Sequence, residues 1–421
     1  MVSAATVTGY EMPDLHPRVE FVDLIQVDLG SDDFRQNWFD LSAAWATRPP
    51  FQVTEGAKPS LVCARYADVR DVLLDPERFT ILNTDPAFRR LAPYKGVKTL
   101  TSSDGDDHAR QRRVMMLPFA PRSIQPILDR AEVVIAETLD AIDARGRGAI
   151  FDARRDFAAP VMERLLLDEM FRMTSDQARA FSVMNETRSA LARLRPGEEP
   201  AADFLEAFEA ARQALSDMIR DRRANPGDDF LSGLLTAEED AQRLSDEEVL
   251  GSLFGIASAT TGSTPSAASL ALFTLCRQPE QLAALRADPD LAGSAMEECL
   301  RYHPPLYLSF PRFATKDTAI GGVPVTAGTA IQLLLAATNL DPTRYPDPLR
   351  FDIARKPAQI LPFGAGPHVC IASRLARGLL QRLVMAMIAR YPNLRLAEAD
   401  FRPRYTGAVG ELVPASLPLA P

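Results

Sequence analysis

The chain is poor in the residues that build disulfide frameworks and zinc sites. Its 421 residues include four cysteines that lie far apart and never in C-x-x-C spacing, namely Cys63, Cys276, Cys299 and Cys370. This pattern excludes a disulfide scaffold and a zinc module, and it predicts a protein of the reducing cytoplasm.

Other features are missing as well. The chain has no repeat, no low-complexity stretch and no Gly/Ser linker, and its 33 prolines are spread through it. The first twenty residues are polar and lack the apolar core of a signal peptide or membrane anchor. A net charge of −9 argues against a nucleic-acid partner. We therefore predict one domain over residues 1–421, irregular at about 1–35, that is a monomer and binds neither membranes nor nucleic acid.

Hydrophobic periodicity predicts a mainly helical fold with a minor β-sheet component. Helices are expected near 36–47, at 66–74 and through most of 105–300, with breaks at 196–197 and 225–227. Strands are expected at 60–65, 308–314, 318–320 and 330–336, whereas 341–356 has no period.

One segment is long enough to cross a membrane, because residues 249–276 contain no charged side chain. The segment nevertheless carries nine Ser or Thr residues, and Ser245 with Glu248 forms a capping box before it. We interpret it as a long helix through the middle of the protein. Pro265 cannot bond to the carbonyl of Thr261, so we expect a kink that leaves this carbonyl for water or substrate. A kink that only serves packing is the alternative.

The most informative run is Phe363-Gly364-Ala365-Gly366-Pro367-His368-Val369-Cys370. Its glycines and proline predict a tight loop, and apolar residues at helical spacing follow it. Cys370 would then lie at a helix N-terminus, where the dipole and unpaired N–H groups favour an anion. We expect this position to lower the thiol pKa and to make a thiolate metal ligand.

This run resembles the haem-binding signature of the cytochrome P450 family. The resemblance implies a P450-like fold, with the long helix over haem b and Cys370 as the axial iron ligand. It also implies that Phe363 packs beside the thiolate. The haem propionates would be held by His108, Arg112, Arg312 and His368. Glu298, Arg301 and Arg355 would form a network that folds the segment before the cysteine loop.

The long helix departs from the family pattern Ala-Gly-x-Asp/Glu-Thr-Thr. The corresponding run is Ala259-Thr260-Thr261-Gly262-Ser263-Thr264, so Gly262 stands at the position of the acid. In the family the acid and the following alcohol relay protons to dioxygen. Ser263 or Thr264 could still bind oxygen or a water, and Glu411 is a candidate substitute acid.

The resemblance implies a monooxygenase that inserts one oxygen atom from dioxygen into a small, mainly apolar organic substrate. The expected pocket residues are Phe79, Leu82, Phe88, Leu91, Phe181, Met184, Leu253, Phe254, Ile256, Leu306, Leu308 and Leu412, although each could equally belong to the core. Arg188 and Arg193 could meet an acidic substrate. Electrons would come from a separate ferredoxin and its NAD(P)H-dependent reductase, docked on Arg110, Arg113, Arg374 and Arg377.

Two other functions remain open at this point. Without the acid–alcohol pair, a haem-thiolate enzyme could use peroxide, or could couple, dehydrate or rearrange its substrate. A relative that lacks haem and serves as a binding or scaffold protein is a third class. The intact Cys370, His108, Arg112 and Arg312 argue against that class.

Overall fold

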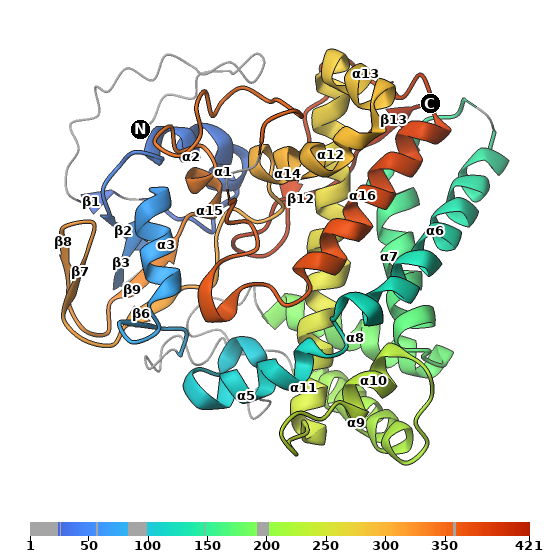
Figure 1. Cartoon of the computed structure of the whole chain (residues 1–421), viewed down its shortest axis with the longest axis horizontal. Helices are drawn as coiled ribbons and strands as arrows, with labels where there is room; N and C mark the ends of the chain where they lie inside the picture. Colours follow the sequence, from blue (N-terminus) through green and yellow to red (C-terminus); the bar gives the residue numbers. More distant parts are fainter. Residues whose placement is uncertain are drawn as a thin grey trace.

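The computed structural model describes residues 24–25, 27–55, 58–82, 99–146, 148–191, 202–356 and 359–421. Most of the helices gather on one side of the molecule and the largest sheet lies on the other (Figure 1). The predicted mainly helical fold with minor sheets is confirmed. No helix among these residues is long and apolar enough to cross a membrane.

The first half of the chain supplies three short helices on the side of the larger sheet, α1 to α3, and then helices of the helical side. Their bounds are α1 (Asp32–Gln36), α2 (Trp38–Trp45), α3 (Tyr66–Leu74), α5 (Gly105–Met116), α6 (Pro121–Ala144), α7 (Ala159–Arg164), α8 (Ser175–Leu191), α9 (Ala202–Ala224) and α10 (Phe230–Thr236). Two π-helical segments, Ala153–Ala158 and Leu165–Met170, continue α7 at its two ends.

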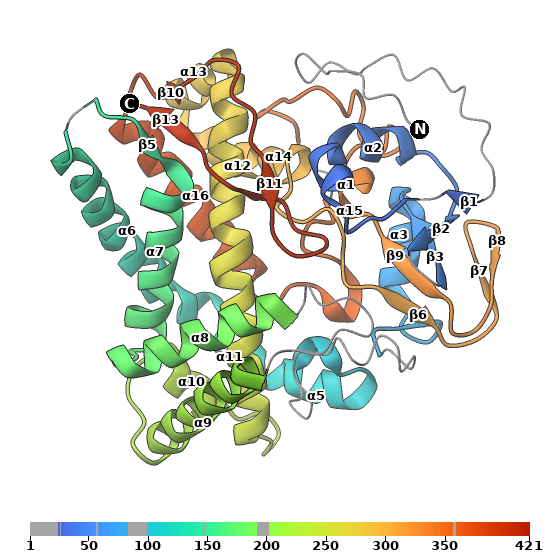
Figure 2. The ribbon, with the colours of Figure 1, turned by 180° about the vertical axis from the view of Figure 1, so that it is seen from behind.

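The second half supplies the central helices. They are α11 (Asp246–Ser258), α12 (Thr264–Arg277), α13 (Pro279–Ala287), α14 (Ala292–Tyr302), α15 (Leu335–Thr338) and α16 (Ser373–Arg390). Figure 2 shows α11 and α12 as one long helix, and both α7 and α16 contact α12.

The strands form one larger sheet and three small ones. The larger sheet has the order β1 (Leu24–Ile25), β2 (Phe51–Glu55), β3 (Lys58–Cys63), β9 (Ala330–Leu333), β6 (Arg312–Ala314) and β4 (Phe79–Thr80). The small sheets join β10 (Arg395–Leu396), β13 (Pro418–Ala420) and β5 (Phe151–Asp152), then β11 (Tyr405–Thr406) with β12 (Val413–Pro414), and β7 (Thr318–Ile320) with β8 (Val323–Val325). Antiparallel pairing of β9 with β6 sets Arg312 opposite Ile331.

The long helix begins at the predicted capping box. The Ser245 hydroxyl accepts from the Glu248 N–H at 3.2 Å, and the Glu248 carboxylate accepts from the Ser245 N–H at 2.9 Å. A π-helical turn, Ala259–Ser263, joins α11 to α12. Pro265 follows closely on this turn, and the backbone of Ser263 just before α12 is helical (φ −76°, ψ −40°), so the helix continues past a residue that has no N–H to donate. The irregularity expected in the long helix near Pro265 is therefore a π turn. A role for the Thr261 carbonyl stays a prediction.

Several boundaries differ from the prediction. Asn37 divides the expected helix at 36–47 into α1 and α2, and α1 begins inside the segment expected to be irregular because Ser31 caps it. Strand β2 was missed, and only the last three residues of 308–314 form a strand. The strand at 330–336 ends at Leu333 and gives way to α15. The break at 225–227 is confirmed. The break at 196–197 lies outside the described residues.

A buried carboxylate organises the segment before the cysteine loop. Arg301 donates from Nε and Nη2 to the two oxygens of Glu298, each at 2.7 Å, and Nε of Arg355 lies 3.2 Å from Glu298 Oε2. The remaining guanidinium N–H groups donate to backbone carbonyls at Asn339, Pro346, Asp347, Pro348 and Arg350. The network predicted from the resemblance is therefore present, and it fixes a segment that has no helix or strand.

A second buried polar group connects the two ends of the chain. His303, at the end of α14, is bonded to the Tyr405 hydroxyl at 2.9 Å and to the Thr274 hydroxyl at 3.3 Å. Its ring also packs against Trp38 of α2 at 5.1 Å between centroids. Complete burial lowers the pKa of His303 to about 3, so the ring is neutral at any pH near 7.

Replacement of Arg301 by Met is expected to destabilise the protein by about 3–5 kcal/mol, because the buried Glu298 charge loses its principal partner. Urea denaturation measures the loss. The matched control is Arg350→Met, whose side chain is 65% exposed and lies 3.9 Å from Asp352. A loss below about 1 kcal/mol for Arg301→Met would contradict the structural role of the pair.

The free energy of unfolding should fall as the pH is lowered below about 6.5, because His303 stays neutral in the folded protein. The unfolded histidine takes up a proton below about pH 6.5, whereas the folded one stays neutral until about pH 3. Stability is therefore full above pH 6.5 and falls at lower pH by up to about 1.4 kcal/mol per unit. Urea denaturation at pH 7.5 and 5 should show a shallower fall for His303→Gln. Equal slopes for the two proteins would refute the assignment.

Candidate haem-thiolate site

Two glycines give the cysteine loop its shape. Gly364 has φ +72° and Gly366 has φ +69°, a region that other residues rarely adopt. A Cβ atom on Gly366 would lie 2.2 Å from the carbonyl oxygen of Leu73 in α3. The Cys370 N–H donates to the Phe363 carbonyl at 2.8 Å, which closes the loop. The loop thus needs glycine both for its backbone and for its contact with α3.

The expectation that the helix N-terminus lowers the pKa of the Cys370 thiol is wrong for the chain without iron. The helix begins at Ser373, three residues later, although the Ala372 N–H, Arg112 and Arg377 do favour the thiolate. Burial is the largest effect, and it raises the pKa of the Cys370 thiol. A coordinated iron would supply the positive charge that removes the proton.

The four predicted propionate-binding residues come together from three parts of the chain. His108 and Arg112 lie one turn apart on α5, Arg312 lies in β6, and His368 lies in the cysteine loop. The rings of His108 and His368 are 4.0 Å apart between centroids. Arg312 is 4% exposed, and its Nη1 donates to the Phe310 carbonyl at 2.9 Å.

This cluster is short of negative charge. Burial, followed by His368 and Arg112, lowers the pKa of His108 to about 4, and burial lowers the pKa of Arg312 to about 10. Asp104 is the nearby carboxylate, and its Oδ1 lies 3.3 Å from Nε2 of His368. Nε2 of His108 is buried and has no hydrogen-bond partner. A buried ring nitrogen without a partner, close to the guanidinium groups of Arg112 and Arg312, fits a ligand that brings carboxylates, as the two haem propionates would.

Phe363 lies at the start of the loop and is half-buried against the core. The guanidinium of Arg377 lies 4.3 Å from the centre of its ring, and Arg377 also pairs with Glu297 at 2.5 Å. The ring is therefore held in place beside the cysteine loop.

The predicted distal residues lie on the π turn and at the start of α12. Ser263 donates its hydroxyl proton to the Ala259 carbonyl at 2.7 Å, and Thr264 is buried. A Cβ atom on Gly262 would meet nothing within 4 Å. The position of the missing acid is therefore open space.

Glu411 is half-buried in the turn between β11 and β12. Its Oε2 accepts from the Ala408 N–H at 2.9 Å, and Arg154 is attracted to its charge. Both contacts hold the Glu411 carboxylate in its present position. Its role as a substitute acid stays a prediction.

The expected pocket residues are only partly placed. Phe88, Leu91, Arg193 and the side chain of Arg188 lie outside the described part of the chain. Phe181, Met184, Leu253, Phe254 and Leu412 are buried in the core. Phe310 is 64% exposed although it is large and apolar, and the prediction missed it. Its position two residues before Arg312 was the available signal.

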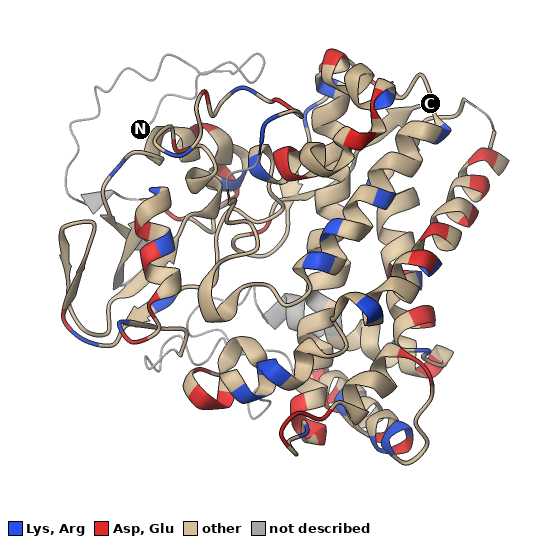
Figure 3. Cartoon of the chain, viewed as in Figure 1, with Lys and Arg blue, Asp and Glu red and all other residues tan. Residues whose placement is uncertain are grey.

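Two of the four arginines predicted for partner docking are already neutralised. Arg110 pairs with Asp107 and Glu248, and Arg377 pairs with Glu297. Arg113 and Arg374 are exposed at α5 and at the start of α16. Figure 3 shows basic residues on both helices.

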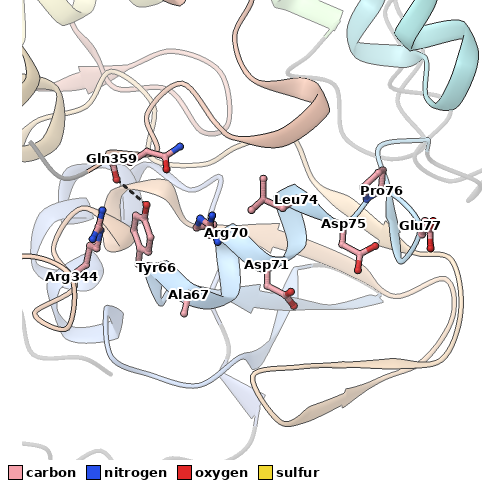
Figure 4. Close-up of a pocket in the computed structure, with 10 residues that line it drawn as sticks. All are labelled: Tyr66, Ala67, Arg70, Asp71, Leu74, Asp75, Pro76, Glu77, Arg344 and Gln359. Atoms are coloured by element: carbon pink, nitrogen blue, oxygen red, sulfur yellow. Dashed lines mark hydrogen bonds between the residues drawn. The ribbon is translucent and has the colours of Figure 1, made fainter.

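An open pocket of about 1050 Å³ runs along α3 beside the cysteine loop. Arg344 and Gln359 lie at one end and Asp75, Pro76 and Glu77 at the other (Figure 4). Arg78 pairs with both Asp71 and Asp75, so it neutralises much of the acidic end. The exposed Arg70 and Arg344 leave a basic end, which the sequence had not indicated.

Comparison with known proteins agrees with these features. The sequence profile described as Cytochrome P450 matches residues 13–413. The chain is 30% identical to cytochrome P450 107B1 of Saccharopolyspora erythraea, over 92% of this chain and 95% of the relative. It is 32% identical to the mycinamicin IV hydroxylase/epoxidase of Micromonospora griseorubida, over 88% and 91%. The structure of P450BioI with a fatty-acid-ligated acyl carrier protein superposes with a TM-score of 0.81 at 27% identity, over 93% and 100%.

Alanine at the two glycines should have opposite effects. Gly366→Ala forces a Cβ atom onto the Leu73 carbonyl, so we expect loss of more than about 2 kcal/mol of stability and of the haem-thiolate absorbance. Gly262→Ala enters open space in a helical turn and should stabilise the protein by about 0.5–1 kcal/mol. Thermal denaturation and the carbon monoxide difference spectrum measure both. A stable, fully loaded Gly366→Ala protein would contradict the loop geometry.

Proposed function

The chain belongs to the cytochrome P450 family of haem-thiolate monooxygenases, and on that premise we propose that it inserts one oxygen atom from dioxygen into a small, mainly apolar organic substrate. The observation that carries the proposal is the surroundings of Cys370. The charge of Arg112 acts on the Cys370 thiol, and the buried Nε2 of His108, one turn away on the same helix as Arg112, has no hydrogen-bond partner. A bound haem with a thiolate ligand supplies the oxygen–oxygen bond cleavage. The side chains of this protein hold the haem, position the substrate and supply protons.

The apolar character of the substrate is supported by the described residues near the expected substrate side. Phe310 leaves 64% of its surface exposed, and Val409, in the turn that contacts Leu308, leaves 60%. An apolar substrate that covered these two side chains would remove their surface from water, which is favourable. The substrates of the relatives differ among themselves, so the identity of this substrate follows from none of them.

A ferredoxin with its NAD(P)H-dependent reductase is the proposed electron donor. Arg70 and Arg344 in the α3 pocket, with Arg113 and Arg374 beside the cysteine loop, form the docking surface. Acidic side chains of the donor would pair with them. The protein would work in the reducing cytoplasm, in agreement with its four free cysteines.

One departure from the family's sequence pattern supports a second function. Gly262 supplies no acid where the family has one, which favours a haem-thiolate enzyme that uses peroxide or that couples, dehydrates or rearranges its substrate. Purified protein with a ferredoxin system in air should be compared with the same protein supplied with hydrogen peroxide. Product that forms only with peroxide, or without incorporation of ¹⁸O from dioxygen, would replace the first proposal by the second.

The haem itself is tested by the carbon monoxide difference spectrum of the reduced protein. A band near the position typical of thiolate ligation is expected for the wild type and should disappear in Cys370→Ala. A protein that takes up no haem would leave only a binding or scaffold role.

Charge reversal at the basic end of the α3 pocket should weaken ferredoxin docking. Arg70→Glu combined with Arg344→Glu is expected to raise the KM for ferredoxin about tenfold while kcat changes little, because the contacts steer association. The control is Arg179→Glu on α8, at a side chain that is 75% exposed. An unchanged KM at low salt would remove these two residues from the docking surface.

A further inference from the structure

A second cavity touches the π turn of the long helix. It has a volume of about 220 Å³ and lies between α7, α8 and that turn. Its polar lining consists of Glu163, Ser182, Glu186 and Thr261, and the rest of the lining is apolar. A cavity of this size with four polar side chains in its lining has room and partners for bound water.

The two carboxylates in the lining reach solvent. Glu163 of α7 and Glu186 of α8 are both exposed, so each can exchange protons with bulk water. Thr261 belongs to the helix that continues into Gly262 and Ser263. The cavity therefore extends from exposed acids to the turn where the family's acid is missing.

Thr261 brings a hydroxyl group to the cavity. This hydroxyl donates to the Ala257 carbonyl at 2.8 Å. The next residue, Gly262, is bordered by open space, and the Ser263 hydroxyl follows it. No side chain at 262 therefore fills the space beside the residue that lines the cavity.

We propose that Glu163 and Glu186 take up protons at the mouth of this cavity and pass them through its water to the Thr261–Ser263 turn, in place of a carboxyl group at position 262. The inference rests on the proposed monooxygenase function. That reaction joins substrate, dioxygen, two electrons and two protons into hydroxylated product and one water. The electrons come from the ferredoxin-type donor, the two protons come from bulk water, and each glutamate is reprotonated by bulk water after every transfer.

The test uses the complete haem-loaded protein with its ferredoxin system. Glu163→Gln combined with Glu186→Gln removes both acids with little change of shape, and Asp176→Asn removes a carboxylate from a more distant part of α8 as the control. We expect the double variant to lose at least fivefold in product formed per NAD(P)H, with hydrogen peroxide released instead. The rate of the first electron transfer and the carbon monoxide difference spectrum should be unchanged.

A conservative variant separates proton transfer from shape. Glu163→Asp combined with Glu186→Asp keeps both carboxyl groups, and it should recover most of the product formed per NAD(P)H. A product yield per NAD(P)H no higher than that of the glutamine variant would overturn the proposal, since it would show that side-chain length and not acidity matters.

A crystal structure of the loaded protein provides a readout that does not depend on activity. Ordered waters should connect at least one of the two glutamates with the Thr261 hydroxyl, and Thr261→Leu should displace those nearest the turn. A cavity without ordered water overturns the route.

The two levels of inference fail differently. An active wild type with full product yield in the double glutamine variant overturns the proton route alone. A wild type that forms no product with dioxygen overturns the monooxygenase proposal and the route together.

Discussion

The buried carboxylate of Glu298 is the interaction on which the cysteine side of the molecule depends. Its two oxygens are used by Arg301, Arg355 and the Asp352 N–H, and the two guanidinium groups use their other donors on carbonyls between Asn339 and Arg350. This part of the chain has no ladder of backbone bonds, so side chains replace the missing ladder. A charge this deeply buried is tolerated because every member of the network is paired.

Burial also determines the chemistry of the cofactor site. The same low exposure that holds Cys370 protonated in the free chain makes the cations around His108 costly when they have no partner. Both costs are removed by one ligand, because an iron ion favours the thiolate and two carboxylates pair with the cations. Cofactor binding and the stability of this region should therefore be strongly coupled.

The sequence predicted those parts of the site that depend on short-range patterns. The glycine loop and the network at Glu298 are present, because each motif keeps its spacing. The α5 residues His108 and Arg112 lie one turn apart as their spacing indicates, and their role in haem binding stays a prediction. The sequence could not show that burial outweighs the helix dipole at Cys370, since burial depends on α3 and α5 packing over the loop. It also could not show that Glu248 and Glu297 neutralise two of the docking arginines, because these partners are distant in sequence. The prediction missed the break between α1 and α2 at Asn37 and the end of β9 at Leu333, where tertiary packing decides the boundary.

The contact between Gly366 and the Leu73 carbonyl has a mechanical consequence. A loop and a helix that touch with no room for a methyl group cannot slide past each other without a change in one of them. The α3 pocket lies on the same helix, so any molecule that displaces α3 on binding there also displaces the backbone that carries Cys370. Docking on α3 would then reach the cysteine loop through this one backbone contact.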